Sequence, residues 1–150
     1  MREILFKGKR LDDGEWVEGF YWTNGLGNHF IRVNQEPFSV YGDYEFVLKD
    51  YDVDPETVCQ YTGLTDCDGK RIFEGDVVRL WDVHNGFDWH AVVEFGNPNC
   101  EYNWGWQLRY INGDCGNCDI LLWVDMDEYG AHCEISGNIF DNPELLKVEE

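Results

Sequence analysis

Hydrophobic and polar residues alternate in short stretches along much of the chain. The clearest stretch covers residues 104–111, where Trp104, Trp106, Leu108 and Tyr110 fall on one face of an expected strand. Clusters of Gly, Asn and Asp interrupt the alternation at intervals of roughly ten residues, the spacing of turns between strands. Further strands are expected at residues 3–7, 16–22, 29–33, 44–48, 77–81, 90–95 and 133–140.

Several turns have sequences that suit tight hairpins. Asp13-Gly14 lies at the centre of a turn over residues 11–15, and Asn85-Gly86 marks another, because Gly adopts positive φ angles without strain. Pro143 can begin one helical turn over residues 142–146. The run at residues 120–124 is entirely apolar and fits a strand or a helix.

These elements predict a mainly β protein, β-rich α+β at most, made of short antiparallel strands and hairpins. A small SH3-like barrel is expected around residues 57–140, because Gly75-Asp76 enters a Val-rich strand, a step common in such barrels. This analogy of fold implies no ligand. The length suits a single domain over residues 1–150. The alternative is an N-terminal β subdomain, residues 1–54, packed on a barrel-like subdomain, residues 55–146.

Aromatic residues are numerous, with 7 Trp, 8 Tyr and 9 Phe. They favour strands and bury large areas, and they also form surfaces that bind partners. Because 43% of the residues are hydrophobic, the chain can bury a sizeable core. The composition therefore allows both a packed β domain and an aromatic interaction surface.

The net charge of −19, from 30 acidic and 11 basic residues, limits the kinds of partner that the chain can bind. Residues 80–150 contain only Arg109 and Lys147 as basic residues. Each phosphate contact needs a Lys or Arg, so no direct nucleic-acid binding is expected. A basic partner, a cation, or simply a well-solvated acidic surface fits this charge.

The sequence predicts neither a signal peptide nor a membrane span. Residues 1–7 lack the apolar stretch and cleavage site of a signal peptide. No apolar run approaches the roughly 18–20 residues of a membrane span. We expect a soluble cytoplasmic protein whose six cysteines stay mostly reduced.

A candidate metal site involves the Cys-x-x-Cys pair Cys115 and Cys118, whose spacing lets two thiolates share one Zn²⁺. His132 and Cys133 could complete the site. Adjacent residues point to opposite faces of a strand, so only one of these two could join easily. Unligated, reduced thiols are the alternative. If zinc binds, the remaining ligand is a histidine or one of Cys59, Cys67 and Cys100.

Other polar clusters are weaker candidates. His84 and His90 flank Asp88 and could bind a metal or transfer protons, but a hairpin bearing surface histidines is the preferred explanation. The acidic run within residues 119–128, which includes Asp119, lacks the spacing and glycine of an EF-hand and is expected to be solvated. No nucleophile elbow or glycine-rich phosphate loop is present, so the chain is not expected to be an enzyme.

Three segments, in order along the chain, resemble the YopX family: residues 2–19, 55–76 and 137–146. Residues 20–54 and 82–133 match it poorly, so any activity particular to this chain is expected there. The central segment is the most distinctive. Its matching residues are Tyr61, Thr62, Gly63, Leu64, Asp68, Gly69, Phe73, Glu74, Gly75 and Asp76.

The resemblance implies a phage- or prophage-type protein in the cytoplasm of a bacterial host, with no established activity to carry over. The central motif itself is expected to be structural. Gly69 and Gly75 suit tight turns, and Asp66 and Asp68 can accept hydrogen bonds from the backbone of their own turn.

Together these observations predict a non-enzymatic, acidic module that binds a protein partner or assembles into a homo-oligomer. An acidic face with aromatic anchors could also mimic DNA toward a basic partner. The alternative is a small metalloprotein with a zinc knuckle at Cys115 and Cys118, and no other cofactor is expected.

Overall fold

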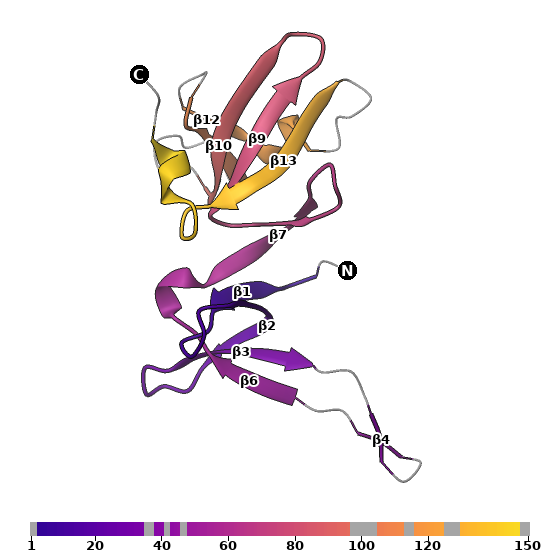
Figure 1. Cartoon of the computed structure of the whole chain (residues 1–150), viewed down its shortest axis with the longest axis vertical. Coiled ribbons are helices and arrows are strands. Elements are labelled where there is room, and N and C mark those ends of the chain that lie inside the picture. The colour runs from indigo at the N-terminus through magenta and orange to yellow at the C-terminus, as the bar shows by residue number, and fades with distance from the viewer. Residues whose placement is uncertain are drawn as a thin grey trace. The chain divides into compact units, whose positions relative to one another are not determined.

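The computed structural model describes residues 3–34, 38–40, 43–45, 48–96, 105–112, 116–124 and 130–147. The predicted mainly β fold is confirmed, since antiparallel strands and single turns of 3-10 helix make up the elements (Figure 1). Contacts divide the chain into two compact units, Met1–Tyr61 and Thr62–Glu150. This division falls after the boundary considered above, between residues 54 and 55, because Cys59 and Gln60 still pair with the first strand.

The first unit is built on an antiparallel sheet in the order β6-β3-β2-β1-β7. A small hairpin of two strands, β4 and β5, lies between β3 and β6 in the chain, and a 3-10 turn, η1, precedes β7. The bounds are β1 Phe6–Lys9, β2 Trp16–Thr23, β3 His29–Asn34, β4 Phe38–Val40, β5 Asp43–Glu45, β6 Leu48–Asp52, η1 Pro55–Thr57 and β7 Cys59–Thr65.

The core of the first unit lies on one face of this sheet. Ile31 and Val53 are 0% and 1% exposed, and an isolated bridge joins Val53 to Arg10, beyond the end of β1. Gly19 lets β2 and β3 approach closely, because a Cβ atom there would lie 2.2 Å from the carbonyl oxygen of Arg32. Any larger residue would force the two strands apart.

The second unit contains the remainder of β7, strand β8 and a five-stranded antiparallel sheet in the order β12-β11-β10-β9-β13. The last strand, β13, pairs along β9 with a bulge between Ile135 and Gly137. The bounds are β8 Arg71–Phe73, β9 Asp76–Asp82, β10 Phe87–Phe95, β11 Trp106–Tyr110, β12 Asn117–Asp119, η2 Ile120–Leu122, β13 Ala131–Asn138 and η4 Pro143–Leu146.

One face of the five-stranded sheet carries the core of the second unit. The apolar run at residues 120–124, consistent from its sequence with a strand or a helix, contains the 3-10 turn η2, which presents Ile120 to the core and leaves Leu121 and Leu122 exposed. Alternating strand residues supply most of the other contacts. The core comprises Ile72, Val78, Leu80, Ala91, Val93, Leu108, Ile120, Trp123, Val124, Ala131 and Cys133.

The SH3-like barrel predicted around residues 57–140 is wrong. Among the described strands, β12 and β13 are the two edges of the five-stranded sheet and do not pair with each other, so this sheet is open. The Gly75-Asp76 sequence, from which the barrel was predicted, has a local structural role. Gly75 has a φ of +85°, and the Asp76 carboxylate accepts the Phe73 amide at 2.8 Å, which closes the turn between β8 and β9.

Asp66, beside the central motif, ties a turn to a distant strand. Its side chain is buried, and one carboxylate oxygen accepts the amides of Asp68 and Lys70 at 3.0 and 2.9 Å. The other oxygen accepts the amide of Ile135 in β13 at 3.0 Å. A buried carboxylate is stable here because it accepts several backbone N–H groups. No helix among the described residues is long and apolar enough to cross a membrane.

Candidate functional site

Strand β6 is an edge of the sheet in the first unit, with β3 as its neighbour. The Val53 amide donates to the carbonyl of His29 at 3.0 Å, and hydrogen-bonded positions alternate along an antiparallel pair. The backbones of Lys49 and Tyr51 therefore point toward β3, and those of the intervening residues point away from it. The Asp52 carbonyl agrees with this assignment, because it accepts the Leu11 amide at 2.9 Å, outside the pairing with β3.

This geometry leaves a short row of backbone groups facing outward from β6. They are the N–H and C=O of Leu48 and Asp50 and the N–H of Asp52. Within the described part of the chain, none of them has a hydrogen-bond partner. Unpaired groups on an edge strand can pair with another chain.

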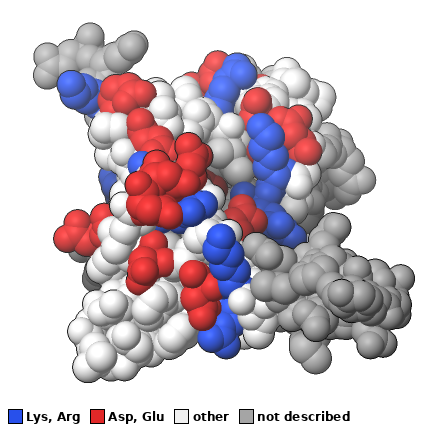
Figure 2. All heavy atoms as spheres, turned by 60° about the horizontal axis from the view of Figure 1, so that its bottom comes forward, with Lys and Arg blue, Asp and Glu red and all other residues white. Residues whose placement is uncertain are grey.

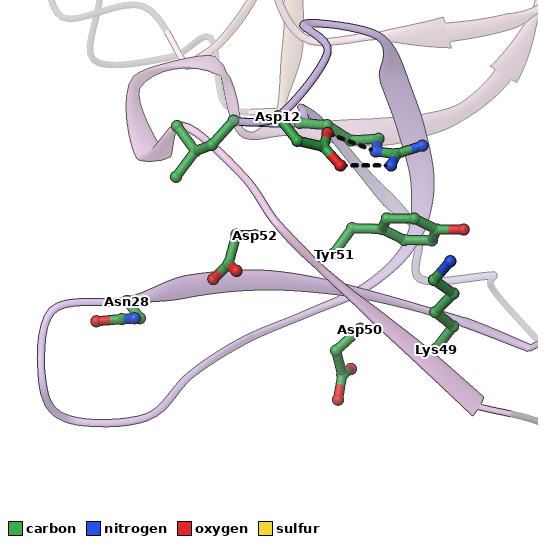
Figure 3. A pocket seen from close by; sticks show the side chains of 8 residues that line it. Asp12, Asn28, Lys49, Asp50, Tyr51 and Asp52 are labelled. Carbon is green, nitrogen blue, oxygen red and sulfur yellow. Dashed lines mark hydrogen bonds and ion pairs between the residues drawn. The ribbon is translucent and has the colours of Figure 1, made fainter.

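A cavity of about 560 Å³ lies along β6. Residues 49–52 line it, together with Asn28 and the turn residues Arg10, Leu11 and Asp12. In Figure 3, Asn28 lies at one end of the cavity, Tyr51 and Lys49 lie at the other, and Asp52 is between them. The cavity thus combines an aromatic ring, charges of both signs and an unpaired strand edge.

Two cationic side chains contact the ring of Tyr51. The guanidinium carbon of Arg10 lies 4.3 Å from the ring centroid, and the Lys49 Nζ lies 4.9 Å from it. Both distances are in the range of cation–π contacts. Arg10 also donates two hydrogen bonds to Asp12, at 3.0 and 2.6 Å, and these bonds hold the pKa of the Asp12 carboxyl below its ordinary value.

Asp50 is fixed by side chains of β3, the neighbouring strand, and of β2 beyond it. Its carboxylate accepts two hydrogen bonds from Arg32, at 2.9 and 3.1 Å, and one from Trp22 Nε1, at 2.9 Å. The bonds from Arg32, and then that from Trp22, lower the pKa of Asp50. Asp52, two residues later, is exposed, so the edge presents one fixed and one unconstrained carboxylate.

Four aromatic residues share the sheet face that carries Asp50 and Asp52, opposite Ile31 and Val53. We call this set the aromatic face: Trp16, Phe20, Trp22 and Phe30.

Within the aromatic face, Trp22 stacks on Phe30 with ring centroids 4.5 Å apart, and Phe20 is 62% exposed. Lys7 and Lys9 lie 4.5 and 5.5 Å from the ring of Trp16. Figure 2 shows both acidic and basic side chains on the side that it presents.

The predicted zinc ligands are only partly described. Cys115 lies outside the described residues. Cys118, in β12, accepts a hydrogen bond from the Tyr110 hydroxyl at 3.0 Å and packs against the core of the second unit. The zinc knuckle therefore stays a prediction.

The other two predicted ligands lie on opposite faces of β13. His132 stacks on Trp81, with ring centroids 5.1 Å apart, whereas Cys133 is 2% exposed in the core. Burial raises the pKa of Cys133 to about 12, which favours the neutral thiol over the thiolate that a metal needs. The structure does not bring His132 and Cys133 together.

One group of possible ligands was missed by the sequence analysis. Ligand atoms of Cys67, Asp68 and Glu134 lie within 4.8 Å of one another. The pairing of β13 with the turn after β7 creates this group, and no local spacing signals it. Cys67 and Asp68 are exposed, and exposed acidic groups often meet without an ion, so we assign no metal site here.

The remaining candidates do not form sites among the described residues. Asp88 pairs with Arg79 through two hydrogen bonds of 2.9 Å, and His84, His90 and Asp88 do not converge as a group of metal ligands within the described ranges. Asp119 accepts the Leu121 amide at 2.9 Å and caps η2. The rest of the acidic run, Asp125, Asp127 and Glu128, lies outside the described residues.

Comparisons with known proteins add the family. Curated protein sequences give no match. Among solved structures, the chain is similar to the crystal structure of protein EF1440 from Enterococcus faecalis, at 19% sequence identity and a TM-score of 0.55, over 98% of this chain and 100% of that one. At this identity the similarity supports the fold alone.

The family model described as "YopX protein" matches residues 21–147. The match includes the central and C-terminal segments that carry the resemblance. It also extends over residues 21–54 and 82–133, so the poor match expected for residues 20–54 and 82–133 is not what the family model shows. The first segment, residues 2–19, lies before the matched range. Since the match spans most of the sequence, the chain belongs to the YopX family.

Proposed function

We propose that the chain is a non-enzymatic, acidic protein-interaction module that binds through the first unit. The observation that carries this proposal is the aromatic face beside the unpaired edge of β6. Phe20 is 62% exposed although it is large and apolar, and its cross-strand neighbour is Arg32. Aromatic residues and Arg are enriched at the centres of protein interfaces.

The surface is also held in place before any partner arrives. Arg32, Asp50 and Trp22 are linked by three hydrogen bonds, and Trp22 stacks on Phe30. Side chains that are already ordered lose less conformational entropy when a partner binds. This arrangement favours recognition. Of the charged side chains that line the cavity, Arg10 and Asp12 pair with each other and Asp50 pairs with Arg32, which leaves these three poorly suited to proton transfer.

A protein is a better partner than a nucleic acid for this face. Arg10 and Arg32 each form an ion pair with an Asp, and the chain as a whole has a net charge of −19. Binding phosphates would require breaking these ion pairs against overall repulsion.

Site-specific photo-crosslinking tests the proposal. A benzoylphenylalanine placed at Phe20 is compared with one at Phe95, a residue of β10 with the same 62% exposure. We expect a discrete cross-linked protein from position 20 in host cells and none from position 95. The mass of the product, with light scattering of the purified chain, distinguishes a separate partner from a second copy. Equal cross-linking from both positions, or none from either with a monomeric chain, would refute the proposal.

A further inference from the structure

We propose that the partner binds as an additional β-strand along the free edge of β6, and that this strand carries Lys or Arg opposite Asp50 and Asp52. The inference rests on the proposed interaction function and specifies its mode and the chemistry of the partner. Its basis is the coincidence of three features at one edge: outward backbone groups, a cavity beside them, and carboxylates on the same strand.

The backbone defines where the added strand can lie. Leu48 and Asp50 each offer one N–H and one C=O group, and Asp52 offers its N–H. The Asp52 carbonyl is already taken by Leu11, so the turn at Leu11 limits the added strand at that end. In strand addition, such main-chain bonds supply affinity, and alternate side chains supply specificity.

The side chains define the preferred charge of the partner. Asp50 and Asp52 share one face of β6, because successive side chains alternate. Opposite charges on directly facing residues of an antiparallel pair stabilise it, and like charges destabilise it. Within the described residues, the Asp52 carboxylate forms no ion pair, so it is available to a cationic side chain.

The other face of β6 favours a different residue type. There the ring of Tyr51 lies between the cationic groups of Arg10 and Lys49. A further cation at this position would be repelled, whereas a β-branched or aromatic side chain can pack on the ring. The partner strand should therefore alternate Lys or Arg with Val, Ile, Thr or an aromatic residue.

A second copy of the chain does not satisfy this pattern. Two-fold pairing of β6 with β6 of another copy must join outward-facing residues to outward-facing residues. The registers with substantial overlap place Asp50 opposite Asp50 of the second copy, Asp50 opposite Asp52, or Lys49 opposite Lys49. Each of these arrangements brings like charges together, so the occupant is a different protein with a basic, extended segment.

Two synthetic peptides of equal charge test the binding mode on the full chain. One alternates Lys and Val, and the other has the same sequence with the backbone nitrogen of each Lys methylated. Because each Lys faces Asp50 or Asp52, the methylated peptide lacks the N–H groups that would point toward β6. We expect the Lys-Val peptide to bind and to slow hydrogen exchange at the amides of Asp50 and Asp52 by tenfold or more, on the order of one net hydrogen bond. Equal binding of the N-methylated peptide would show charge attraction alone and overturn the inference.

A matched pair of variants locates the site. Asp50→Pro removes an N–H that points away from β3, so the pairing with β3 is kept, and Asp50→Ala removes only the carboxylate. We expect the Pro variant to bind the Lys-Val peptide on the order of tenfold more weakly than the Ala variant. Leu48→Pro against Leu48→Ala repeats the comparison if Asp50→Pro does not fold.

Equal affinities within each pair would overturn the edge-binding mode. Cross-linking from position 20 that persists while both peptide tests fail would leave the interaction function in place and refute only strand addition. If the cross-link from position 20 is absent and both peptide tests fail, both the interaction function and strand addition are refuted.

Discussion

Replacing Asp66 by Ala should destabilise the second unit far more than its position in a turn suggests. The substitution removes the acceptor for three backbone amides, those of Asp68, Lys70 and Ile135. A hydrogen bond to a charged group contributes about 1.5–3 kcal/mol, but the two turn amides can partly regain bonds to water. We therefore expect Asp66→Ala to lower the free energy of unfolding by about 3 kcal/mol.

Asp66→Asn provides a graded comparison, because its single remaining oxygen can serve the turn or Ile135 but not both. We expect it to cost about half as much as the Ala substitution. The control is Asp68→Ala, since the Asp68 side chain is exposed in the same turn and its loss should change stability by less than about 0.5 kcal/mol. Urea unfolding followed by tryptophan fluorescence gives these values. If Asp66→Ala and Asp68→Ala unfold at the same urea concentration, the carboxylate does not hold β13 to the turn.

Four further predictions concern thiol reactivity, titration and metal content. At pH 8, iodoacetamide should modify Cys67 rapidly and leave Cys133 intact in mass spectra, because burial raises the pKa of Cys133 to about 12. The stability due to this neutral thiol is complete below pH 9 and is lost as pH rises toward 12, by up to about 4 kcal/mol, which alkaline unfolding curves would measure. Arg79→Gln should raise the pKa of Asp88 toward its ordinary value in an NMR titration, since hydrogen bonds from Arg79 lower it. If the predicted zinc knuckle exists, protein purified without chelator contains about one equivalent of Zn²⁺ and Cys115→Ser loses it; less than ~0.1 equivalent in the unmodified chain would end that idea.

The alternation of apolar and polar residues predicted well those strands that have one buried face and one exposed face. The strand expected at residues 16–22 is β2, Trp16–Thr23, and that expected at residues 29–33 is β3, His29–Asn34. The barrel prediction failed because closure depends on which distant strands meet at the sheet edges. Alternation within a strand describes its two faces, but it contains no information about its neighbours.

The candidate site was hidden for a related reason. A strand was expected at residues 44–48, whereas β6 covers Leu48–Asp52 and is mostly polar, so it lacks the hydrophobic period that marks a buried strand. Its edge position arises from the strand order, and its proximity to Arg10 arises from the contacts of the turn after β1 with Asp52 and Val53. A short strand rich in charged residues is itself typical of an edge, and that signal could have identified β6.

The pairing of β13 with β9 also determines when the second unit can fold during synthesis. β13 supplies Ala131 and Cys133 to the core and is synthesised after the other described strands of the second unit. Until then, β9 is an uncovered edge, and nascent edges of this kind are prone to aggregate. The first unit, in contrast, comprises residues up to Tyr61, all of which are synthesised earlier. Translation that stops before residue 131 should therefore yield a chain whose first unit folds and whose second unit is a substrate for chaperones and proteases.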